Sequence, residues 1–225
     1  MATIILLRHA HSSANSEGIL AGRKVGISLS ERGREESQDV ARRLSGIEFR
    51  HIHVSPLERC SQTLEPLLKS KEGSRIQTLT LEDRVIEMDY GKWSGEKLSK
   101  LAKKQLWKEI QTSPSKVTFP DGESFKAMKK RSMNLVNELL KEKGDAVHLI
   151  VSHGDVIKVI VASLLGMKLD GFQSLVIDPA SITVFQGNAK QVRMVAFNDS
   201  HTPVHSLIGS GVKKRAVLGG GSGKK

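Results

Sequence analysis

The chain has 225 residues, a formal net charge of +11, and 38% hydrophobic but only 4% aromatic residues, which suits one or two α/β domains with aliphatic cores. No apolar stretch reaches the roughly 18–20 residues of a membrane-spanning helix, and the short apolar start lacks the basic leader of a secretory signal. These properties exclude a membrane-embedded protein, and we expect no membrane partner.

The chain begins with a short predicted strand that ends at two chemically versatile residues. Residues 3–7 are apolar or β-branched, which is typical of a buried strand, and Arg8 and His9 follow directly. A polar loop is expected over residues 10–29. Residues 30–44 predict a helix, because a serine stands at the N-cap position and acids occupy the first turn.

The next segments repeat this alternation of strand and helix. Residues 52–55 predict a short strand that a proline stops, and residues 58–69 predict the helix behind it. Residues 76–81 alternate enough to predict a third strand, which runs into a loop that carries Glu87.

Two amphipathic segments follow this loop. Residues 98–110 and 125–141 have apolar residues at three- and four-residue spacing, which predicts a helix for each. The turn-rich residues 114–124 separate them and cap the second. Trp107 lies on the apolar stripe of the first helix, and we interpret it as a core residue.

The last elements are a strand, a helix and a closing pair of strands. Residues 147–151 form an apolar run typical of a buried strand, and residues 156–165 predict the helix after it. Residues 181–186 and 191–197 predict two further strands around Gly187-Asn188, a dipeptide suited to a tight hairpin turn.

This order of elements predicts an α/β fold. Strands that alternate with helices imply a three-layer α/β/α sandwich with a mostly parallel central sheet, an antiparallel edge strand and a helical lid insertion. Residues 1–207 are interpreted as one domain. Residues 208–225 are interpreted as a flexible basic tail, since they are rich in glycine and lysine and contain no acid.

Charge and cysteine content limit the partners and the location. Without the five cations of the tail the chain carries +6, which is ordinary for a protein that handles phosphorylated anions. Basic and aromatic residues are not interleaved as in binders of single-stranded nucleic acid, so we expect no nucleic-acid partner. Cys60 is the only cysteine, which excludes an internal disulfide and favours the reducing cytoplasm.

Histidine and arginine recur where predicted strands end. His9 follows the first strand and His153 follows the strand at residues 147–151, while Arg8 and Arg59 follow the first and second strands. An arginine fork binds phosphate bidentately, and histidine is mostly neutral at pH 7, so its imidazole can attack phosphorus. The pattern predicts a phosphate that arginines hold and a histidine attacks.

The same reaction needs an acid for the departing alkoxide and further hydrogen-bond donors. Glu87 is the candidate acid, and nearby Trp93 could desolvate its carboxyl and raise its pKa. Asn15 and Ser12 can donate hydrogen bonds from the loop after the first strand, although ordinary turn bonding is an alternative for both.

With these motifs the chain resembles the histidine phosphatase superfamily, which includes cofactor-dependent phosphoglycerate mutases and many phosphatases. The resemblance rests on ordered blocks spread over about 200 residues, which makes it highly specific. The blocks are Arg8-His9-Ala10 with Asn15, residues 29–35, Ser55-Pro56-Leu57 with Arg59, Gln62 and Thr63, Glu87 with Gly91, Trp93 and Gly95, Ser152-His153-Gly154, and Asn198-Asp199.

The resemblance implies a catalytic domain and a role for each site residue. It implies that His9 is the phosphorylated nucleophile, that Glu87 is the proton donor, and that neither a metal nor a cofactor takes part. The catalytic candidates are His9, Glu87, His153, Arg8 and Arg59. The substrate-binding candidates are Arg8, Ser12, Asn15, Arg59, Tyr90, His153 and Gly154.

Some positions depart from the family pattern. Ala10 replaces the commoner glycine, and His11 stands where many relatives have Glu or Gln. The Asn-Lys pair and the paired arginines that mutases use for a second phosphate are absent, which favours a phosphatase over a mutase. Tyr90 is shared with mutases and keeps a mutase reaction open.

A zinc hydrolase and an inactive phosphate-binding module are the competing hypotheses. A zinc hydrolase could use His9, His11, His153 and Asp155, but the adjacent arginines would place positive charge beside the cation. A phosphate-binding module without activity would need the arginines but neither His9 nor Glu87. Lysines at positions 92, 97 and 103 hint at an anionic small molecule such as a phosphoacid or a sugar phosphate, and the oligomeric state, a homodimer included, is undecided.

Overall fold

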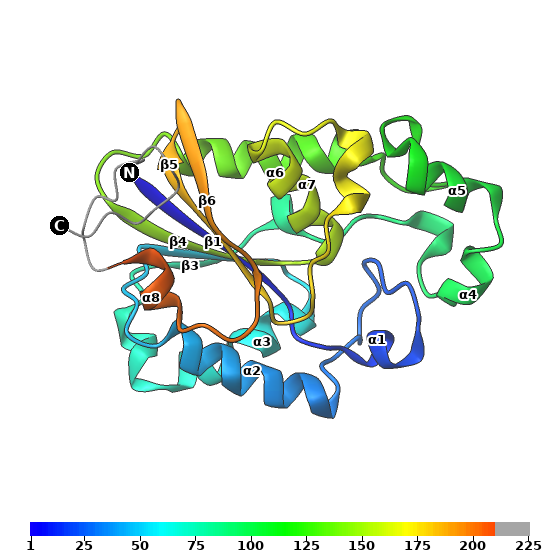
Figure 1. Cartoon of the computed structure of the whole chain (residues 1–225). Coiled ribbons are helices and arrows are strands. Elements are labelled where there is room, and N and C mark those ends of the chain that lie inside the picture. The colour runs from blue at the N-terminus through cyan, green and yellow to red at the C-terminus, as the bar shows by residue number, and fades with distance from the viewer. Residues whose placement is uncertain (210–225) are drawn as a thin grey trace.

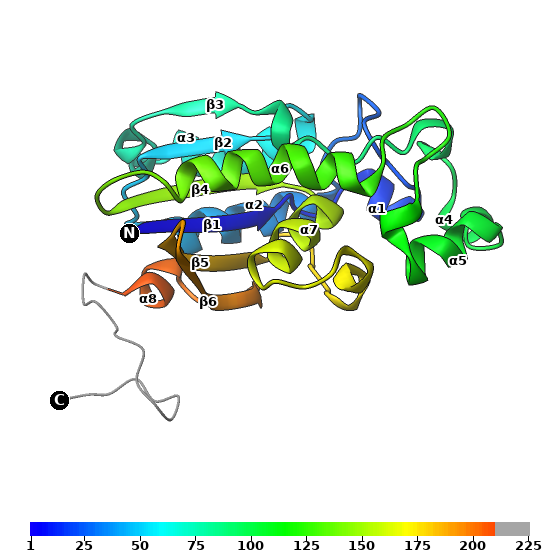
Figure 2. The same cartoon turned by 90° about the horizontal axis from the view of Figure 1, so that it is seen from above.

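A six-stranded mixed sheet forms the centre of the computed structural model, which describes residues 1–209 apart from the side chains of Glu72 and Ser74. The strand order is β3-β2-β4-β1-β5-β6, as Figure 2 shows from above. The strands are β1 (Ala2–Arg8), β2 (His51–Val54), β3 (Leu79–Leu81), β4 (Ala146–Ser152), β5 (Ile182–Asn188) and β6 (Gln191–Asp199).

Most neighbouring strands run in the same direction. Strands β1, β2, β3 and β4 pair parallel, whereas β5 pairs antiparallel with β1 and β6 antiparallel with β5. The predicted mostly parallel sheet with an antiparallel edge is confirmed. The carboxyl ends of the parallel strands therefore meet at one edge of the sheet, where α/β proteins bind ligands.

Helices cover both faces of the sheet, as expected for a three-layer sandwich. Helices α2 and α3 lie against one face and α6 and α7 against the other, while α4 and α5 lie beyond the carboxyl ends of the parallel strands (Figure 1). The α-helices are α1 (Ser13–Glu17), α2 (Glu31–Leu44), α3 (Glu58–Lys69), α4 (Leu98–Leu101), α5 (Gln105–Thr112), α6 (Phe125–Leu139), α7 (Gly154–Leu164) and α8 (Val204–Ile208). Short 3-10 helices span Lys71–Arg75, Asp83–Val85, Gly91–Trp93, Pro114–Lys116 and Leu169–Ser174.

Alternate side chains of β1 belong to the two hydrophobic cores. Ile4 and Leu6 pack in one cluster with residues of α6 and α7, whereas Ile5 and Leu7 pack in the other with residues of α2 and α3. A slip of one residue would exchange the two sets, so burial on both faces specifies the register of β1. That register in turn places Arg8 at the carboxyl edge of the sheet.

The predicted lid helix over residues 98–110 consists of two shorter helices. Helix α4 ends at Leu101 and α5 begins at Gln105, because Lys104 between them adopts an extended backbone with ψ of 147°. Trp107 then stacks on Trp93 with ring centroids 6.5 Å apart. Local periodicity reflects only residues that are close in the sequence, so it carries no information on this tertiary contact. It therefore predicts one continuous helix.

Two strands near the edges also differ from their predicted bounds. The closing hairpin turns at residues 189–190 instead of Gly187-Asn188, because Oδ1 of Asn188 accepts hydrogen bonds from the backbone nitrogens of Lys190 and Gln191. Strand β3 begins at Leu79 instead of residue 76, and its three residues are exposed. Because this edge strand is exposed, extending its pairing would bury little further surface, and the strand stays short.

Across residues 1–209 we find no helix with both the length and the apolar character needed to cross a membrane. The predicted basic tail, from residue 210 onward, lies outside the described residues, so its flexibility stays a prediction.

Candidate active site

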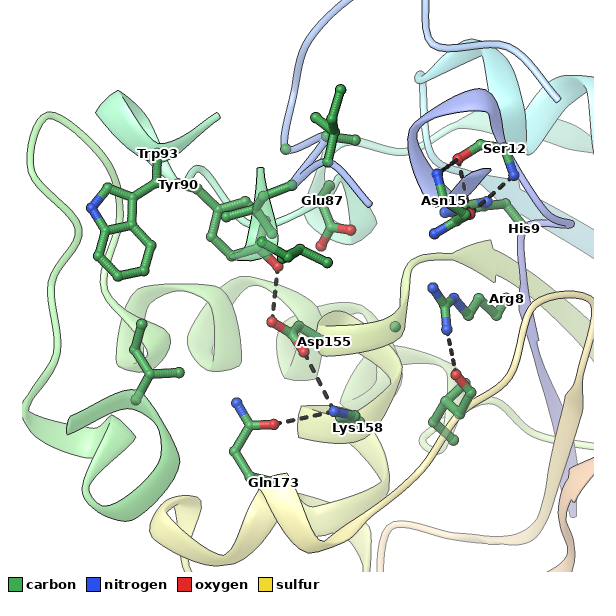
Figure 3. Close-up of a pocket in the computed structure, with 18 of the residues that line it drawn as sticks. Arg8, His9, Ser12, Asn15, Glu87, Tyr90, Trp93, Asp155, Lys158 and Gln173 are labelled. Atoms are coloured by element: carbon green, nitrogen blue, oxygen red, sulfur yellow. Dashed lines mark hydrogen bonds and ion pairs between the residues drawn. The ribbon is translucent and has the colours of Figure 1, made fainter. Parts of the chain in front are cut away.

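A cavity of about 530 Å³ lies at the carboxyl edge of the parallel strands, and Figure 3 shows the residues around it. Its volume falls within the roughly 300–1,000 Å³ of small-molecule sites. Most of the predicted site residues line it, and His153 is buried behind Arg59. The predicted residues in the lining are Arg8, His9, Ser12, Asn15, Arg59, Glu87, Tyr90 and Gly154.

His9 follows the last residue of β1, and its ring is held in one orientation. Nδ1 lies 2.7 Å from the carbonyl oxygen of Ala10, so Nδ1 carries the hydrogen and Nε2 is the unprotonated nitrogen. Nε of Arg59 donates to Nε2 at 3.3 Å. Burial, followed by the charges of Arg59 and Arg8, holds the pKa of His9 well below its usual value. The imidazole is therefore neutral and able to act as a nucleophile.

Arg59 lies in the first turn of α3 and is only 1% exposed. Its Nη2 donates to the carbonyl oxygen of Gly22 at 2.9 Å and to Nδ1 of His153 at 3.2 Å. Its Nη1 is buried without a hydrogen-bond partner among the described residues. A buried cationic N–H group without a partner is costly, so it is a ready donor for a bound anion.

Arg8 ends β1 and presents a second guanidinium to the same cavity. Its Nη1 donates to the carbonyl oxygen of Ile177, while its buried Nε has no hydrogen-bond partner in the described part of the chain. Gly154 lies beside it, since a Cβ added there would come 3.4 Å from Cζ of Arg8. Arg8 and Arg59 thus leave two buried cationic N–H groups without a hydrogen-bond partner among the described residues, and the charges of both arginines act on His9.

His153 is the single residue between β4 and α7. Its Nε2 lies 2.7 Å from the hydroxyl of Ser55, and its Nδ1 accepts from Arg59 and lies 3.6 Å from Oε2 of Glu87. The rings of His9 and His153 meet edge to face with centroids 5.2 Å apart. Burial, followed by the charges of Arg59 and His9, lowers the pKa of His153 well below its usual value.

Glu87 supplies the carboxyl group closest to these histidines. Its Oε1 accepts from the backbone nitrogen of Met88 at 2.9 Å, and the residue is 9% exposed. Burial, reinforced by the negative charge of Asp155, raises the pKa of Glu87 to about 7. In the view of Figure 3 the Tyr90 ring is drawn between Trp93 and Glu87, and desolvation of the carboxyl by Trp93 stays a prediction.

The backbone of Glu87 is fixed by two arginines that sequence reasoning missed. Its carbonyl oxygen accepts from Nε of Arg23 at 2.9 Å and from Nη2 of Arg131 at 3.2 Å. Both guanidinium groups also pair with the carboxylate of Glu123, at 2.9 and 2.6 Å. This network joins the loop of Glu87 to α6.

Ser12 and Asn15 form a capping box at the start of α1, inside the segment predicted as a loop. Oδ1 of Asn15 accepts from the backbone nitrogen and the hydroxyl of Ser12, at 3.0 and 2.9 Å. The amide oxygen of Asn15 thus makes the turn contact, and its amide nitrogen is the atom that can donate to a ligand. Both residues line the cavity.

A row of polar side chains also lines the cavity. Sequence reasoning proposed Tyr90 among them as a substrate contact and Asp155 only as a zinc ligand. The Tyr90 hydroxyl donates to Oδ2 of Asp155 at 2.8 Å, and Nζ of Lys158 lies 3.8 Å from Oδ1 of the same carboxylate. Lys158 also donates to Oε1 of Gln173 at 3.1 Å (Figure 3). Asp155 directly follows the second histidine block, which was an available signal, whereas Gln173 had none.

His11, a candidate ligand in the zinc-hydrolase hypothesis, does not join the cavity lining. Its Nδ1 lies 2.9 Å from the hydroxyl of Ser30, on the other side of the loop. Within residues 1–209, no three His, Cys, Asp or Glu side chains are grouped so that they could hold a metal ion. The geometry of these residues does not fit a zinc hydrolase.

Comparisons with known proteins agree with this site. A family model of the histidine phosphatase superfamily (branch 1) matches residues 4–200. Phosphoserine phosphatase 1 of Hydrogenobacter thermophilus is 33% identical over 189 residues, which cover 82% of this chain and 86% of that protein. A 2,3-bisphosphoglycerate-dependent phosphoglycerate mutase of Thermoplasma acidophilum is 26% identical over 184 residues, with coverage of 82% and 86%.

A solved structure gives the same result for the fold. The phosphoserine phosphatase of Entamoeba histolytica, in complex with 3-phosphoglyceric acid, superposes with a TM-score of 0.74 at 25% identity. The superposition covers 88% of this chain and 98% of that chain. The sheet and the cavity at its carboxyl edge thus define a phosphatase-type enzyme that acts on phosphoric monoesters. The chain belongs to the histidine phosphatase superfamily, as its motifs predicted.

Proposed function

We propose that this enzyme hydrolyses small phosphomonoesters in two displacements at Nε2 of His9. The observation that carries the proposal is that Arg8 and Arg59, each with a buried guanidinium N–H group that lacks a partner among the described residues, line the same cavity as His9 with its unprotonated Nε2. A phosphate dianion would satisfy both N–H groups and place phosphorus next to the nucleophile. The phosphoserine phosphatase likeness supports the same reaction class.

In the first displacement, Nε2 of His9 forms a bond to phosphorus while the bond from phosphorus to the ester oxygen breaks. Glu87 gives its proton to that oxygen, so the alcohol leaves neutral. Arg8 and Arg59 hold the non-bridging oxygens, with Ser12, the amide of Asn15 and the backbone at Gly154 as further contacts.

In the second displacement, water attacks phosphorus and the bond to Nε2 breaks. The carboxylate of Glu87 takes a proton from the water, which returns both residues to their starting states. Neutral His153 accepts from Nη2 of Arg59 through Nδ1, and so holds that guanidinium group beside the phosphate. Tyr90 orients Asp155, and the proposed route uses neither a metal nor a cofactor.

The test is a search for the covalent intermediate. Rapid quenching in alkali during turnover should trap a phosphoryl group on the protein, and this group should be lost in acid, as expected for a P–N bond. His9→Ala should abolish both the adduct and turnover of an aryl phosphate. His11→Ala, which removes a histidine outside the cavity, should keep both. Turnover without any adduct would contradict the proposal.

A mutase reaction is the second candidate, since relatives include a phosphoglycerate mutase. A mutase substrate carries a second anionic group, which needs its own cationic site. Beyond Arg8 and Arg59, Lys158 is the only lysine or arginine in the described lining of the cavity, and Asp155 and Gln173 already engage it. This arrangement supports hydrolysis as the main reaction.

A further inference from the structure

The cavity extends well beyond the groups that would hold a phosphate. Figure 3 shows Trp93 on the side of the pocket away from Arg8 and His9. Trp107 stacks on Trp93, and the lining of the cavity also includes the apolar side chains of Leu98, Ile110 and Val176. The role of Trp107 as a core residue, expected from the sequence, is therefore corrected: it is only partly buried and lines this end of the cavity.

Two of these apolar side chains are unusually exposed. Leu98 is 38% and Val176 60% exposed, and they come from opposite parts of the chain, α4 and the segment before β5. Apolar surface that is exposed at the edge of a cavity often marks a site for an apolar ligand group. Trp93 and Trp107 form a fixed wall beside them, with rings inclined by only 14°.

The charged residues of the cavity also favour a leaving group without a second negative charge. Lys158 is matched by Asp155, and Asp178 adds a further carboxylate to the lining. The lysines that suggested an anionic substrate do not line the cavity, and Lys92 instead pairs with Asp121 at 3.0 Å on the surface. Among the described residues of the lining outside the phosphate-binding end, a second negative charge on the substrate would meet only the cation of Lys158, which Asp155 and Gln173 already engage. Lys104 lies outside the lining, with Nζ 5.4 Å from the centroid of the Trp93 ring.

We infer that the enzyme selects phosphomonoesters whose leaving group carries an apolar body and no second negative charge. The inference rests on the proposed phosphatase function and names its substrate class. It separates this chain from the relatives whose names point to phosphoserine or phosphoglycerate, since both of those compounds carry a carboxylate beside the phosphate.

The test uses a series of linear alkyl monophosphates from ethyl to octyl, with phosphoserine and 3-phosphoglycerate for comparison. The alkanols leave with similar basicity, so kcat/KM reports binding of the chain rather than intrinsic reactivity. Each fully buried methylene raises kcat/KM about fourfold at most. We expect at least a tenfold rise from butyl to octyl phosphate, and no preference for the two carboxylated substrates over ethyl phosphate.

Two variants locate the effect. Leu98→Ala and Val176→Ala should each flatten the dependence of kcat/KM on chain length. The matched control is Leu68→Ala, because Leu68 on α3 is 42% exposed but lies outside the cavity, and this variant should keep the wild-type slope.

The outcomes separate this inference from the proposed function. A kcat/KM that does not depend on chain length, or a preference for phosphoserine or 3-phosphoglycerate, overturns the inference. The proposed function still stands in that case, provided that turnover depends on His9. A chain-length effect that survives in both cavity variants also overturns it. If none of the phosphates in the panel is hydrolysed, the proposed function is overturned, and the inference is overturned with it.

Discussion

Burial sets opposite protonation states for the neighbouring titratable residues of the cavity. The same loss of water contact that keeps His9 and His153 neutral raises the pKa of the Glu87 carboxyl to about 7. Desolvation disfavours the charged form of each group, which is the protonated form for imidazole and the ionised form for a carboxyl. One physical cause thus produces a nucleophile and a proton donor at the same pH.

The role of Glu87 predicts a dependence on both pH and leaving group. Its carboxyl holds the required proton below pH 7 and loses it as pH rises, so kcat/KM for an alkyl phosphate should fall above about pH 7. Glu87→Gln should lower kcat/KM, which reports the first displacement, about 10²–10⁴-fold for an alkyl phosphate and far less for 4-nitrophenyl phosphate, whose leaving group needs no proton. Steady-state kinetics with both substrates measure the difference. An equal loss for the two substrates would exclude the acid role.

Pairing between strands brings the two histidines together. The parallel register of β1 and β4 pairs Arg8 with Ser152, and the backbone nitrogen of His9 donates to the carbonyl oxygen of Ser152 at 2.9 Å. Each strand then leads into a short turn and a helix. The sheet therefore sets the distance between His9 and His153, and the following turns aim their rings.

Helix α2 supports the loop after β1 through close backbone contact at Gly33. A Cβ at this position would lie 1.8 Å from the carbonyl oxygen of His11, so Gly33→Ala must displace the loop that follows His9. We expect the free energy of unfolding to fall by about 1–3 kcal/mol, together with a lower kcat/KM. Gly171→Ala is the matched control, because its Cβ would meet only Met167 at 3.7 Å. Urea denaturation measures both, and equal stabilities would contradict the predicted clash.

Across the whole molecule, buried histidines link stability to pH. Besides the two at the cavity, His51, His53 and His148 lie side by side on β2 and β4, and the rings of His51 and His53 stack 3.9 Å apart. Neither ring nitrogen of His53 has a hydrogen-bond partner among the described residues. Burial, followed by the charges of His51 and His148, lowers the pKa of His53 to about 4.

These lowered pKa values predict a loss of stability in mild acid. Between pH 6.5 and 4 the unfolded chain binds protons that the folded chain does not, so the free energy of unfolding falls as pH falls. Each such histidine contributes a slope of about 1.4 kcal/mol per pH unit. His53→Gln should reduce the total slope by about that amount, as measured by urea denaturation at pH 7, 6 and 5. An unchanged slope would show that His53 is protonated in the folded protein.

Much of the fold and most of the candidate site residues follow from local sequence patterns. The segments at residues 30–44, 58–69 and 125–141 contain α2, α3 and α6, because apolar periodicity acts within a few residues, and Ser30 and Ser124 cap the first and the last of these helices. The strand ends at Arg8 and before His153 were predictable for the same reason. Since parallel strands share a carboxyl edge, their meeting could be inferred before any coordinates.

Other features depend on contacts between residues that are distant in the chain. The break before Gln105, the place of Trp107 in the cavity and the row from Tyr90 through Asp155 to Lys158 and Gln173 all arise from packing between separate elements. A local pattern contains no information on which side chains face each other across a cavity. The sequence by itself determined the sheet, the family and the candidate phosphate-binding residues, because these rest on burial periodicity and ordered motifs. Only the tertiary structure decided the protonation states and the apolar end of the cavity, because desolvation and enclosure arise once the chain has folded.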